Sequence, residues 1–335
     1  MNNNKFGFDL KSVEPQESYK DGSITSVTSK EMTGLVNLSF SILKLKKSAS
    51  QEPTWHPNAN KIGYCQQGCA LISIRGPAGV DVFNVEMGDV FFIPQGYIHQ
   101  ITNVGANETM IAFALNNAVP EALSLSKAIH SLSDEVFAAT FAGTSPDFFQ
   151  GLKKSTKEDT IKPLPSVKDP GFIPSRFKFN IHNSAKTIST KGGYLQLATK
   201  TNLPVLDGLG ILGFGLNPKG FVEPHWHTNA GELVYVMKGN TRITVLSPDG
   251  SVNTLEVNAG GGAFAPASHF HNIENVGGDD VEIVAFFSNA EPDYIGIGEV
   301  IGAYSNETLA SIFDLPTNYF ADFKKPTEPL VIVPI

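Results

Sequence analysis

Two histidines separated by one residue, His225 and His227, are the residues of this chain most suited to chemistry, and Glu232 follows closely behind them. Because side chains alternate along a strand, both imidazoles are expected on the same face. His271 lies in a third strand-like segment, after a glycine-rich turn. Three imidazoles and one carboxylate form a ligand set typical of a divalent transition metal. The spacing therefore predicts a metal site whose four side chains converge inside a β-barrel.

The elements that must position these residues occur twice, because the two halves of the chain align on each other. A repeat of this length indicates a duplicated domain rather than a solenoid. Matched positions lie 171 residues apart in the first part of each half and 172 residues apart beyond it. The pairs include Gly22 and Gly193, Pro53 and Pro224, Trp55 and Trp226, His56 and His227, Gly68 and Gly239, Gly88 and Gly260, His99 and His271, and Asn103 and Asn275.

Each half is predicted to consist of short strands separated by turns, with a pair of helices at its end. The expected strands include residues 70–74, 90–93, 241–246 and 281–287, and the expected helices are residues 123–129, 134–141, 297–303 and 306–313. Ser133 and Ser305 stand where N-cap residues belong. A polar, proline-bearing linker over residues 153–175 separates a first domain, residues 1–165, from a second, residues 176–335.

Composition narrows the class of partner. The chain has 335 residues, enough for two domains, and 41% of them are hydrophobic. A net charge of −8 and the lack of a basic cluster argue against a nucleic-acid partner. No apolar run approaches the ~20 residues needed to cross a membrane, the N-terminus carries no secretion signal, and two cysteines are too few for a disulfide framework. We therefore expect a cytoplasmic protein that acts on small molecules.

Both glycine-bounded histidine motifs resemble those of the cupin superfamily. The first motif is found as His225, His227, Glu232 and Gly239, and the second as Gly260, Pro266, His271 and Asn275. Ser268 replaces the usual glycine of the second motif. The glycine that opens the first motif lies one residue before its usual position, at Gly220. The first half keeps the second motif, so the chain resembles a bicupin of the oxalate decarboxylase, germin and seed-globulin branch. The resemblance implies an all-β fold of two tandem double-stranded β-helix (jelly-roll) barrels, each with appended C-terminal helices.

The two halves differ at the predicted ligands. Thr54 and Lys61 stand where the second half has His225 and Glu232. A lysine ammonium donates hydrogen bonds only and would repel a metal ion, so the N-terminal barrel is expected to be metal-free. It is then either a structural scaffold or a site where Lys61, beside His56 and His99, replaces the metal as a positive charge and holds an anion.

A set of three histidines and one carboxylate leaves two open positions on a six-coordinate metal, which is typical of a reactive site. The resemblance makes Mn the expected metal, with Fe, Ni, Co or Zn as alternatives. In the resembling oxalate enzymes an arginine near the first ligand grips the substrate, but here that position is Val222, and Gln51 in the other half. A small dianion needs such a charge-assisted partner, so oxalate is not the expected substrate.

Residues around the predicted metal site are less clearly indicated. Phe214, Phe264 and Phe286 belong either to the barrel core or to a substrate pocket. The resembling decarboxylases carry a mobile acidic residue after the second motif, and Glu291 is the candidate catalytic acid–base residue in that segment. Asp293 is matched by Glu121 in the first half and is read as structural.

These observations predict a metal-binding bicupin enzyme acting on a small carboxylate or carbonyl compound, by decarboxylation or oxygen-dependent oxidation. An Fe-dependent ring-cleaving dioxygenase is the first alternative, although such sites usually lack the glutamate that Glu232 provides here. A non-catalytic metal- or ligand-binding protein is the second. Association into a homo-oligomer is possible in each case.

Overall fold

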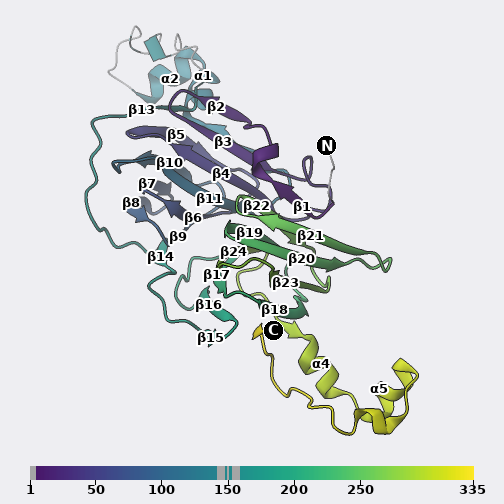
Figure 1. Ribbon diagram of the computed structural model, residues 1–335. Coiled ribbons are helices and arrows are strands. Elements are labelled where there is room, and N and C mark those ends of the chain that lie inside the picture. The colour runs from purple at the N-terminus through teal and green to yellow at the C-terminus, as the bar shows by residue number, and fades with distance from the viewer. Residues whose placement is uncertain (1–4, 142–147, 149–150, 153–158) are drawn as a thin grey trace. The chain divides into compact units, whose positions relative to one another are not determined.

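The computed structural model describes residues 5–141, 148, 151–152 and 159–335. Within them, antiparallel strands form four sheets, two in each half of the chain (Figure 1). Side chains from both sheets of the second half share one core, which includes Phe214 and Ala285 from one sheet and Val222 and Ile273 from the other. Two sheets packed on a common core form the jelly-roll barrel that the sequence predicts.

The sheets of the first half contain seven and six strands. The seven-stranded sheet has the order β14 (Lys178–Asn180), β9 (Asp89–Ile93), β6 (Lys61–Gln67), β11 (Thr109–Leu115), β4 (Ser39–Leu45), β3 (Gly22–Val27) and β2 (Glu17–Tyr19). The six-stranded sheet comprises β12 (Leu123–Ser124), β5 (Ala49–Trp55), β10 (Ile98–Asn103), β7 (Cys69–Gly76) and β8 (Gly79–Glu86), and β13 (Ile161–Pro163) also pairs with β5.

The sheets of the second half repeat this arrangement. The seven-stranded sheet has the order β1 (Gly7–Asp9), β22 (Gly261–Ala265), β19 (Glu232–Lys238), β24 (Val281–Phe287), β17 (Gly210–Leu216), β16 (Gly193–Ala198) and β15 (Ile188–Thr190). The six-stranded sheet comprises β21 (Val252–Asn258), β20 (Asn240–Leu246), β23 (His271–Asn275), β18 (Gly220–Trp226) and β25 (Ile295–Gly296), and β26 (Ile332–Pro334) also pairs with β18.

Helices follow each barrel as predicted: α1 (Leu125–His130) and α2 (Asp134–Thr140) after the first, α4 (Ile297–Ala303) and α5 (Asn306–Phe313) after the second. The hydroxyls of Ser133 and Ser305 cap α2 and α5 by accepting hydrogen bonds from the backbone. Short 3₁₀ helices lie at Leu10–Ser12 and Thr317–Phe320. No helix within the described ranges combines the length and apolar character required to cross a membrane.

Matched turns in the two barrels have matched conformations. Gly68 and Gly239 both have a φ of 83°, in the left-handed region that glycine adopts most readily. Ser268, which stands where Gly96 lies in the first half, also has a positive φ of 62°. Ser268 therefore keeps the left-handed backbone conformation of the motif glycine. This conformation is less favourable for serine than for glycine, because the Cβ atom lies close to the backbone.

Contacts divide the chain into two compact units. One unit comprises Pro15–Ser26 and Phe40–Phe179. The other comprises Asn180–Ile335 together with Val27–Ser39 and the segment up to Glu14. The N-terminal segment joins the second barrel because β1 extends its sheet, with Gly7 opposite Ala263, and because Phe6 lies in its core.

The predicted domains, residues 1–165 and 176–335, differ from these units in the N-terminal segments, and their boundaries stay a prediction. Of the predicted linker over residues 153–175, residues 153–158 lie outside the described residues, and β13 occupies part of the remainder.

Replacement of Phe6 by alanine tests the place of the N-terminal segment. The side chain is 1% exposed within the core of the second barrel, so Phe6→Ala should destabilise that barrel by about 3–5 kcal/mol. Trp55→Phe leaves Trp226 as the single tryptophan, and its fluorescence then reports unfolding of the second barrel. Phe172→Ala, at a phenylalanine that is 77% exposed, is the matched control. Equal stability of both variants would contradict the assignment.

Candidate metal centre

Three strand ends of the second barrel bring the four predicted ligands together. His225 lies near the end of β18 and His227 just after it, Glu232 begins β19, and His271 begins β23. His225 and His271 are direct partners in the antiparallel register of β18 and β23. All four side chains are buried, and their candidate ligand atoms lie within 4.8 Å of one another.

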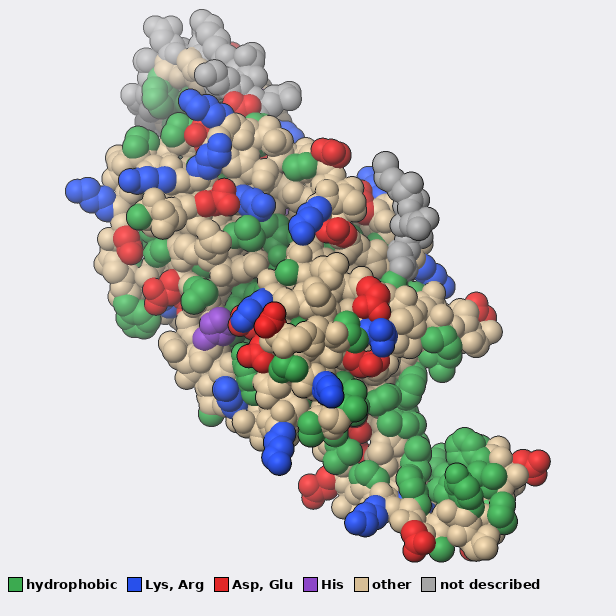
Figure 2. Space-filling view, in the orientation of Figure 1, with side chains coloured by type: hydrophobic (Ala, Val, Ile, Leu, Met, Phe, Trp, Pro, Cys, Tyr) green, Lys and Arg blue, Asp and Glu red, His purple; other side chains and the backbone are tan. Residues whose placement is uncertain are grey.

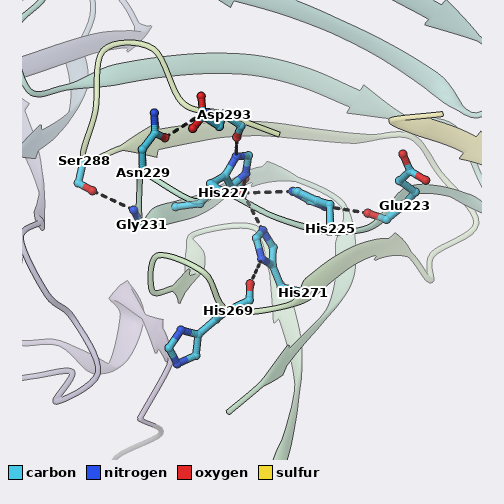
Figure 3. Close-up of polar contacts among 10 residues, drawn as sticks. Glu223, His225, His227, Asn229, Gly231, His269, His271, Ser288 and Asp293 are labelled. Atoms are coloured by element: carbon cyan, nitrogen blue, oxygen red, sulfur yellow. Dashed lines mark hydrogen bonds and ion pairs between the residues drawn. The ribbon is translucent and has the colours of Figure 1, made fainter. Parts of the chain in front are cut away.

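One carboxylate oxygen of Glu232 is the common neighbour of the three rings. Its Oε2 lies 2.9 Å from Nε2 of His271, 3.0 Å from Nε2 of His227 and 3.7 Å from Nε2 of His225. Figure 3 shows the three imidazole rings turned toward a common point. The geometry thus joins all four residues that the sequence singled out.

The opposite nitrogen of each ring fixes its tautomer. Nδ1 of His225 lies 2.7 Å from the carbonyl oxygen of Glu223, and Nδ1 of His271 lies 2.8 Å from that of His269 (Figure 3). Nδ1 of His227 faces the carbonyl oxygen of Asp293 in the same way. A carbonyl oxygen only accepts, so each Nδ1 carries the proton and donates it. In a neutral ring, Nε2 then presents a lone pair to the carboxylate.

Charge effects within the cluster are strong because it excludes water. Burial, followed by the charge of the neighbouring His271, lowers the pKa of His225 to about 4. Burial also lowers the pKa of His227, but the hydrogen bond and charge of Glu232 raise it more, so it lies above its usual value. Burial raises the pKa of Glu232, yet its hydrogen bonds with the three histidines hold that pKa well below its usual range. Glu232 is therefore anionic, as a metal ligand must be.

This donor set fits a divalent transition metal. Lone pairs of three imidazoles and a carboxylate face one another at short distance, and only a proton or a cation between them removes the repulsion. Imidazole and carboxylate together suit Mn, Fe, Co, Ni and Zn. The hydrogen bonds from Nδ1 to backbone carbonyls orient the rings, as they do for ligating histidines in general. The four side chains could therefore hold such an ion and leave part of its coordination sphere open.

A small cavity of about 50 Å³ adjoins the cluster. A single water needs about 10–15 Å³ measured in this way, so the cavity has room for a few waters or a small ligand. Besides three of the candidate ligands, its lining is apolar or aromatic and holds no cationic side chain. The lining residues are Leu195, Leu212, Phe214, Val222, His225, His227, Glu232, Phe287, Tyr294, Val331 and Ile332.

Tyr294 forms one wall of this cavity, and Glu223 supports it from behind. The Tyr294 ring stacks on His225, with ring centroids 4.6 Å apart, and its hydroxyl donates to Oε1 of Glu223 at 3.2 Å. The same Oε1 accepts hydrogen bonds from the backbone nitrogens of Leu330 and Val331, which places β26 beside the cavity. Glu223 thus anchors the C-terminal strand and does not line the cavity.

The predicted aromatic neighbours are only partly placed at the site. Phe214 lines the cavity, but Phe264 and Phe286 do not. On β24 the residues that enter the barrel core are Val281, Ile283, Ala285 and Phe287, so Phe286 points to the opposite face. Phe264 on β22 is excluded for the same reason, because Ala263 and Ala265 face the core.

The predicted acid–base residue lies apart from the histidines. The Glu291 side chain is exposed and does not line the cavity; its backbone oxygen accepts from the Asn229 side chain at 3.0 Å. Its catalytic role stays a prediction. Asp293 has the structural role that the repeat suggests, because its carbonyl oxygen orients His227 and its nitrogen donates to Oδ1 of Asn229.

Six cavity residues were not found from the sequence: Leu195, Leu212, Phe287, Tyr294, Val331 and Ile332. They come from β16, β17, β24, β26 and the loops beside β25 and β26, all outside the two motifs. Tyr294 lies directly after Asp293, in the acidic segment that follows the second motif. That position is the one signal in the sequence that could have indicated it.

The described residues of the first barrel contain no comparable group of metal ligands. The surrounding scaffold is nevertheless the same in both halves. Nδ1 of His56 lies 2.8 Å from the carbonyl oxygen of Glu121, and the nitrogen of Glu121 donates to Oδ1 of Asn58. These contacts repeat those of His227, Asp293 and Asn229 in the second barrel. The difference between the halves is therefore confined to the residues at the centre.

Comparison with known proteins also divides the chain into two similar halves. A family model described as Cupin matches residues 8–146 and again residues 179–318. An oxalate decarboxylase of Arthroderma benhamiae is 22% identical over 313 residues, covering 84% of this chain and 73% of its own length. A prunin of Prunus dulcis is 30% identical over 154 residues, covering 43% of this chain and 27% of its own length.

Among solved structures, oxalate decarboxylase from Bacillus subtilis superposes with a TM-score of 0.86 at 23% identity, over 98% of this chain and 87% of its own. The match to a double-barrel structure over nearly the whole chain confirms the predicted fold. The two family matches confirm the duplication and the resemblance inferred from the motifs. This chain belongs to the cupin family and is a bicupin similar to the oxalate decarboxylases and seed globulins.

Proposed function

We propose that the second barrel binds one divalent transition metal through His225, His227, Glu232 and His271, and that the protein is a metalloenzyme for a small carboxylate or carbonyl compound. One observation carries the proposal. Three imidazole nitrogens surround a single carboxylate oxygen, and each ring is already donating its proton on the far side. The lone pairs of such a cluster are satisfied by a proton or by a cation, and a divalent cation at the centre engages all four groups at once.

Manganese is the metal that we favour. The oxalate decarboxylase of Bacillus subtilis has Mn(II) centres, and imidazole with carboxylate suits that ion. The same ligands accept Fe, Co, Ni or Zn, and availability in the cell decides among metals that one geometry can hold.

The reaction is proposed to take place in the cavity beside the cluster. A bound divalent ion supplies Lewis acidity, which polarises a carbonyl or carboxylate oxygen. The protein contributes the surroundings: Tyr294, Phe287 and Val331 exclude water, and the ring of Tyr294 holds His225 in place by stacking. Decarboxylation and oxygen-dependent oxidation of a small substrate both fit such an enclosed, mainly apolar space.

Oxalate is not the substrate that we propose. The wall residue at the position of the family's arginine is Val222, which is buried and lines the cavity. A dianion placed there would have no charge-assisted donor besides the metal. A monoanionic carboxylate or a neutral carbonyl compound has the smaller desolvation cost and suits this cavity better.

The cavity also separates this proposal from the alternatives. A cavity of about 150 Å³ is needed to hold benzene, whereas this one measures about 50 Å³, so a ring-cleaving dioxygenase would have to open the site. A purely metal- or ligand-binding protein remains the second candidate, because the four-ligand cluster serves storage of an ion as well as catalysis. Release of a product from a carboxylate or carbonyl compound distinguishes the enzyme from that candidate.

A homo-oligomer is proposed as the form of the protein. Large apolar side chains are exposed on α5 and the segment after it: Ile312, Phe313, Tyr319 and Phe323. Figure 2 shows them as a group of hydrophobic side chains around α5. A patch of this kind is typical of a surface that is covered by another protein chain.

Substrate choice can be tested with metal-loaded protein and a panel of pyruvate, glyoxylate, malonate and oxalate, by recording CO₂ release and oxygen uptake. We expect turnover of at least one monoanionic or carbonyl compound and only background rates with oxalate, because Val222 offers no cationic donor. Val222→Arg should raise the rate with oxalate, and Val222→Leu is the control for size. Rapid conversion of oxalate by the unmodified protein would contradict the substrate proposal while leaving the metal site intact.

Replacement of the carboxylate ligand should weaken metal binding strongly. Glu232→Gln keeps the shape of the side chain but removes the charge that faces all three histidines. The affinity for Mn(II), measured by calorimetric titration, should fall beyond the roughly 10–100-fold typical of residues that only support a ligand. Glu256→Gln, at an exposed glutamate of the same barrel, is the matched control. Unchanged affinity in Glu232→Gln would remove this residue from the ligand set.

Acid should abolish the stabilisation that a metal gives. Binding requires neutral imidazoles, so protons compete with the metal for His225, His227 and His271. In the metal-free folded protein the pKa of His225 is about 4, whereas in the unfolded chain it is about 6.5. Between these two pH values the unfolded chain binds more protons than the folded protein. The contribution of His225 to stability is therefore complete above about pH 6.5 and is lost as the pH falls toward about 4.

The gain in melting temperature from Mn(II) should therefore be largest at and above about pH 7 and shrink as the pH falls toward about 5. Fluorescence of Trp226 in a Trp55→Phe background follows the second barrel, with chelator-treated protein as the reference. A gain that is independent of pH would show that the histidines do not bind the metal.

A further inference from the structure

The centre of the first barrel holds a buried cation that no acidic group neutralises directly. Lys61 begins β6 and is 6% exposed. Its Nζ lies 3.5 Å from Nε2 of His99 and 4.0 Å from the centroid of the Phe113 ring. Among the described residues it forms no ion pair, and the nearest acidic influence on it is the charge of Glu17 at longer range. A buried ammonium with so few partners is costly unless something else satisfies it.

Two buried polar side chains on β5 also have an atom without a hydrogen-bond partner. Oε1 of Gln51 and Oγ1 of Thr54 are fully buried and have no hydrogen-bond partner, although their side chains are more than nine-tenths buried. Both lie on β5, at positions matched by Val222 and His225, which line the cavity of the second barrel. Thr54 is also the register partner of His99. Unsatisfied buried polar atoms are rare, so the unpaired hydroxyl of Thr54, on the residue paired with the histidine that Lys61 contacts, indicates a polar ligand.

The two histidines of the first barrel do not supply that partner. Nδ1 of His56 and Nδ1 of His99 face the carbonyl oxygens of Glu121 and Tyr97, so both rings carry their proton on that side. Burial, followed by the charge of Lys61, lowers the pKa of His56 to about 3 and that of His99 well below its usual value. Both rings are therefore neutral, and Lys61 is the cation of the cluster.

The barrel interior has been rebuilt around this lysine. Phe91 and Phe113 stand where the second barrel has Ala263 and Ala285, and Gly63 makes room for both rings. The Phe113 ring supports the ammonium by a cation–π contact. Both rings are larger than the alanines at the matched positions, which leaves less interior volume for a ligand than in the second barrel.

We propose that the first barrel is a binding site for a small monocarboxylate anion, held by the ammonium of Lys61 together with the hydroxyl of Thr54. A carboxylate accepts hydrogen bonds from both groups and cancels the buried charge. A bound anion would also keep the amine protonated, which burial alone opposes by lowering the pKa of Lys61 to about 7. The site needs no metal and is independent of the activity proposed for the second barrel.

Calorimetric titration of the full chain, stripped of metal by a chelator, tests this proposal. Formate and acetate are the probes, and formamide and acetamide are neutral controls of the same shape. We expect saturable binding of one anion per chain and no binding of the amides. Lys61→Met should lower the affinity by roughly tenfold or more, because a charge-assisted hydrogen bond is lost. Thr54→Val, which keeps the shape of the side chain, should lower it by a smaller factor.

Glu232→Gln controls for binding in the second barrel and should leave the affinity for formate and acetate unchanged. Removal of a buried charge is compatible with folding, so Lys61→Met should melt at or above the temperature of the unmodified protein. Absence of binding to the unmodified protein at concentrations well above about 1 mM would overturn the proposal. Equal affinity in Lys61→Met would also overturn it, and so would loss of binding in Glu232→Gln.

Discussion

Oε2 of Glu232 lies within 3.7 Å of Nε2 of three buried imidazoles, and each of these imidazoles donates its other nitrogen to a backbone carbonyl. Without a proton or a cation at the centre, the lone pairs of these groups repel one another in a space that water does not reach. The surrounding elements maintain this arrangement: the paired ends of β18 and β23 set the spacing of His225 and His271, and Asp293 orients His227. The metal site, the cavity beside it and the function proposed for both depend on this constraint.

The two barrels show how one scaffold supports different chemistry. Asn103 and Asn275 fix equivalent turns, each by donating to two backbone oxygens and accepting from a glycine nitrogen. The centre differs, where Lys61 replaces Glu232 and Thr54 replaces His225. A divalent metal with its carboxylate and a lone ammonium carry the same single net positive charge. Under the two proposals, each centre would therefore attract a small anion, one through a metal and the other through an amine.

The sequence predicted that the four candidate ligands converge, because the spacing within a motif follows from strand alternation and short turns. The elements β24, α4 and α5 also lie at the predicted residues. The sequence did not predict the cavity lining. Phe264 and Phe286, which the sequence left open between core and pocket, are buried and do not line the cavity. A continuous apolar run does not reveal which face of a strand each residue occupies. Val331 and Ile332 reach the site through pairing of β26 with β18, and β1 joins the second barrel through pairing with β22. Such long-range pairings leave no local signal in the sequence.

Metal content measured on the natively purified full chain tests the central claim most directly. Elemental analysis by mass spectrometry, after growth with Mn and Fe both supplied, gives the identity of the metal and the number of ions per chain. If the four residues around Glu232 are the metal ligands and Lys61 excludes an ion from the first barrel, the protein carries about one transition metal per chain. Two tightly held ions per chain, or none after Mn(II) is supplied to the folded protein, would contradict this account of both barrels.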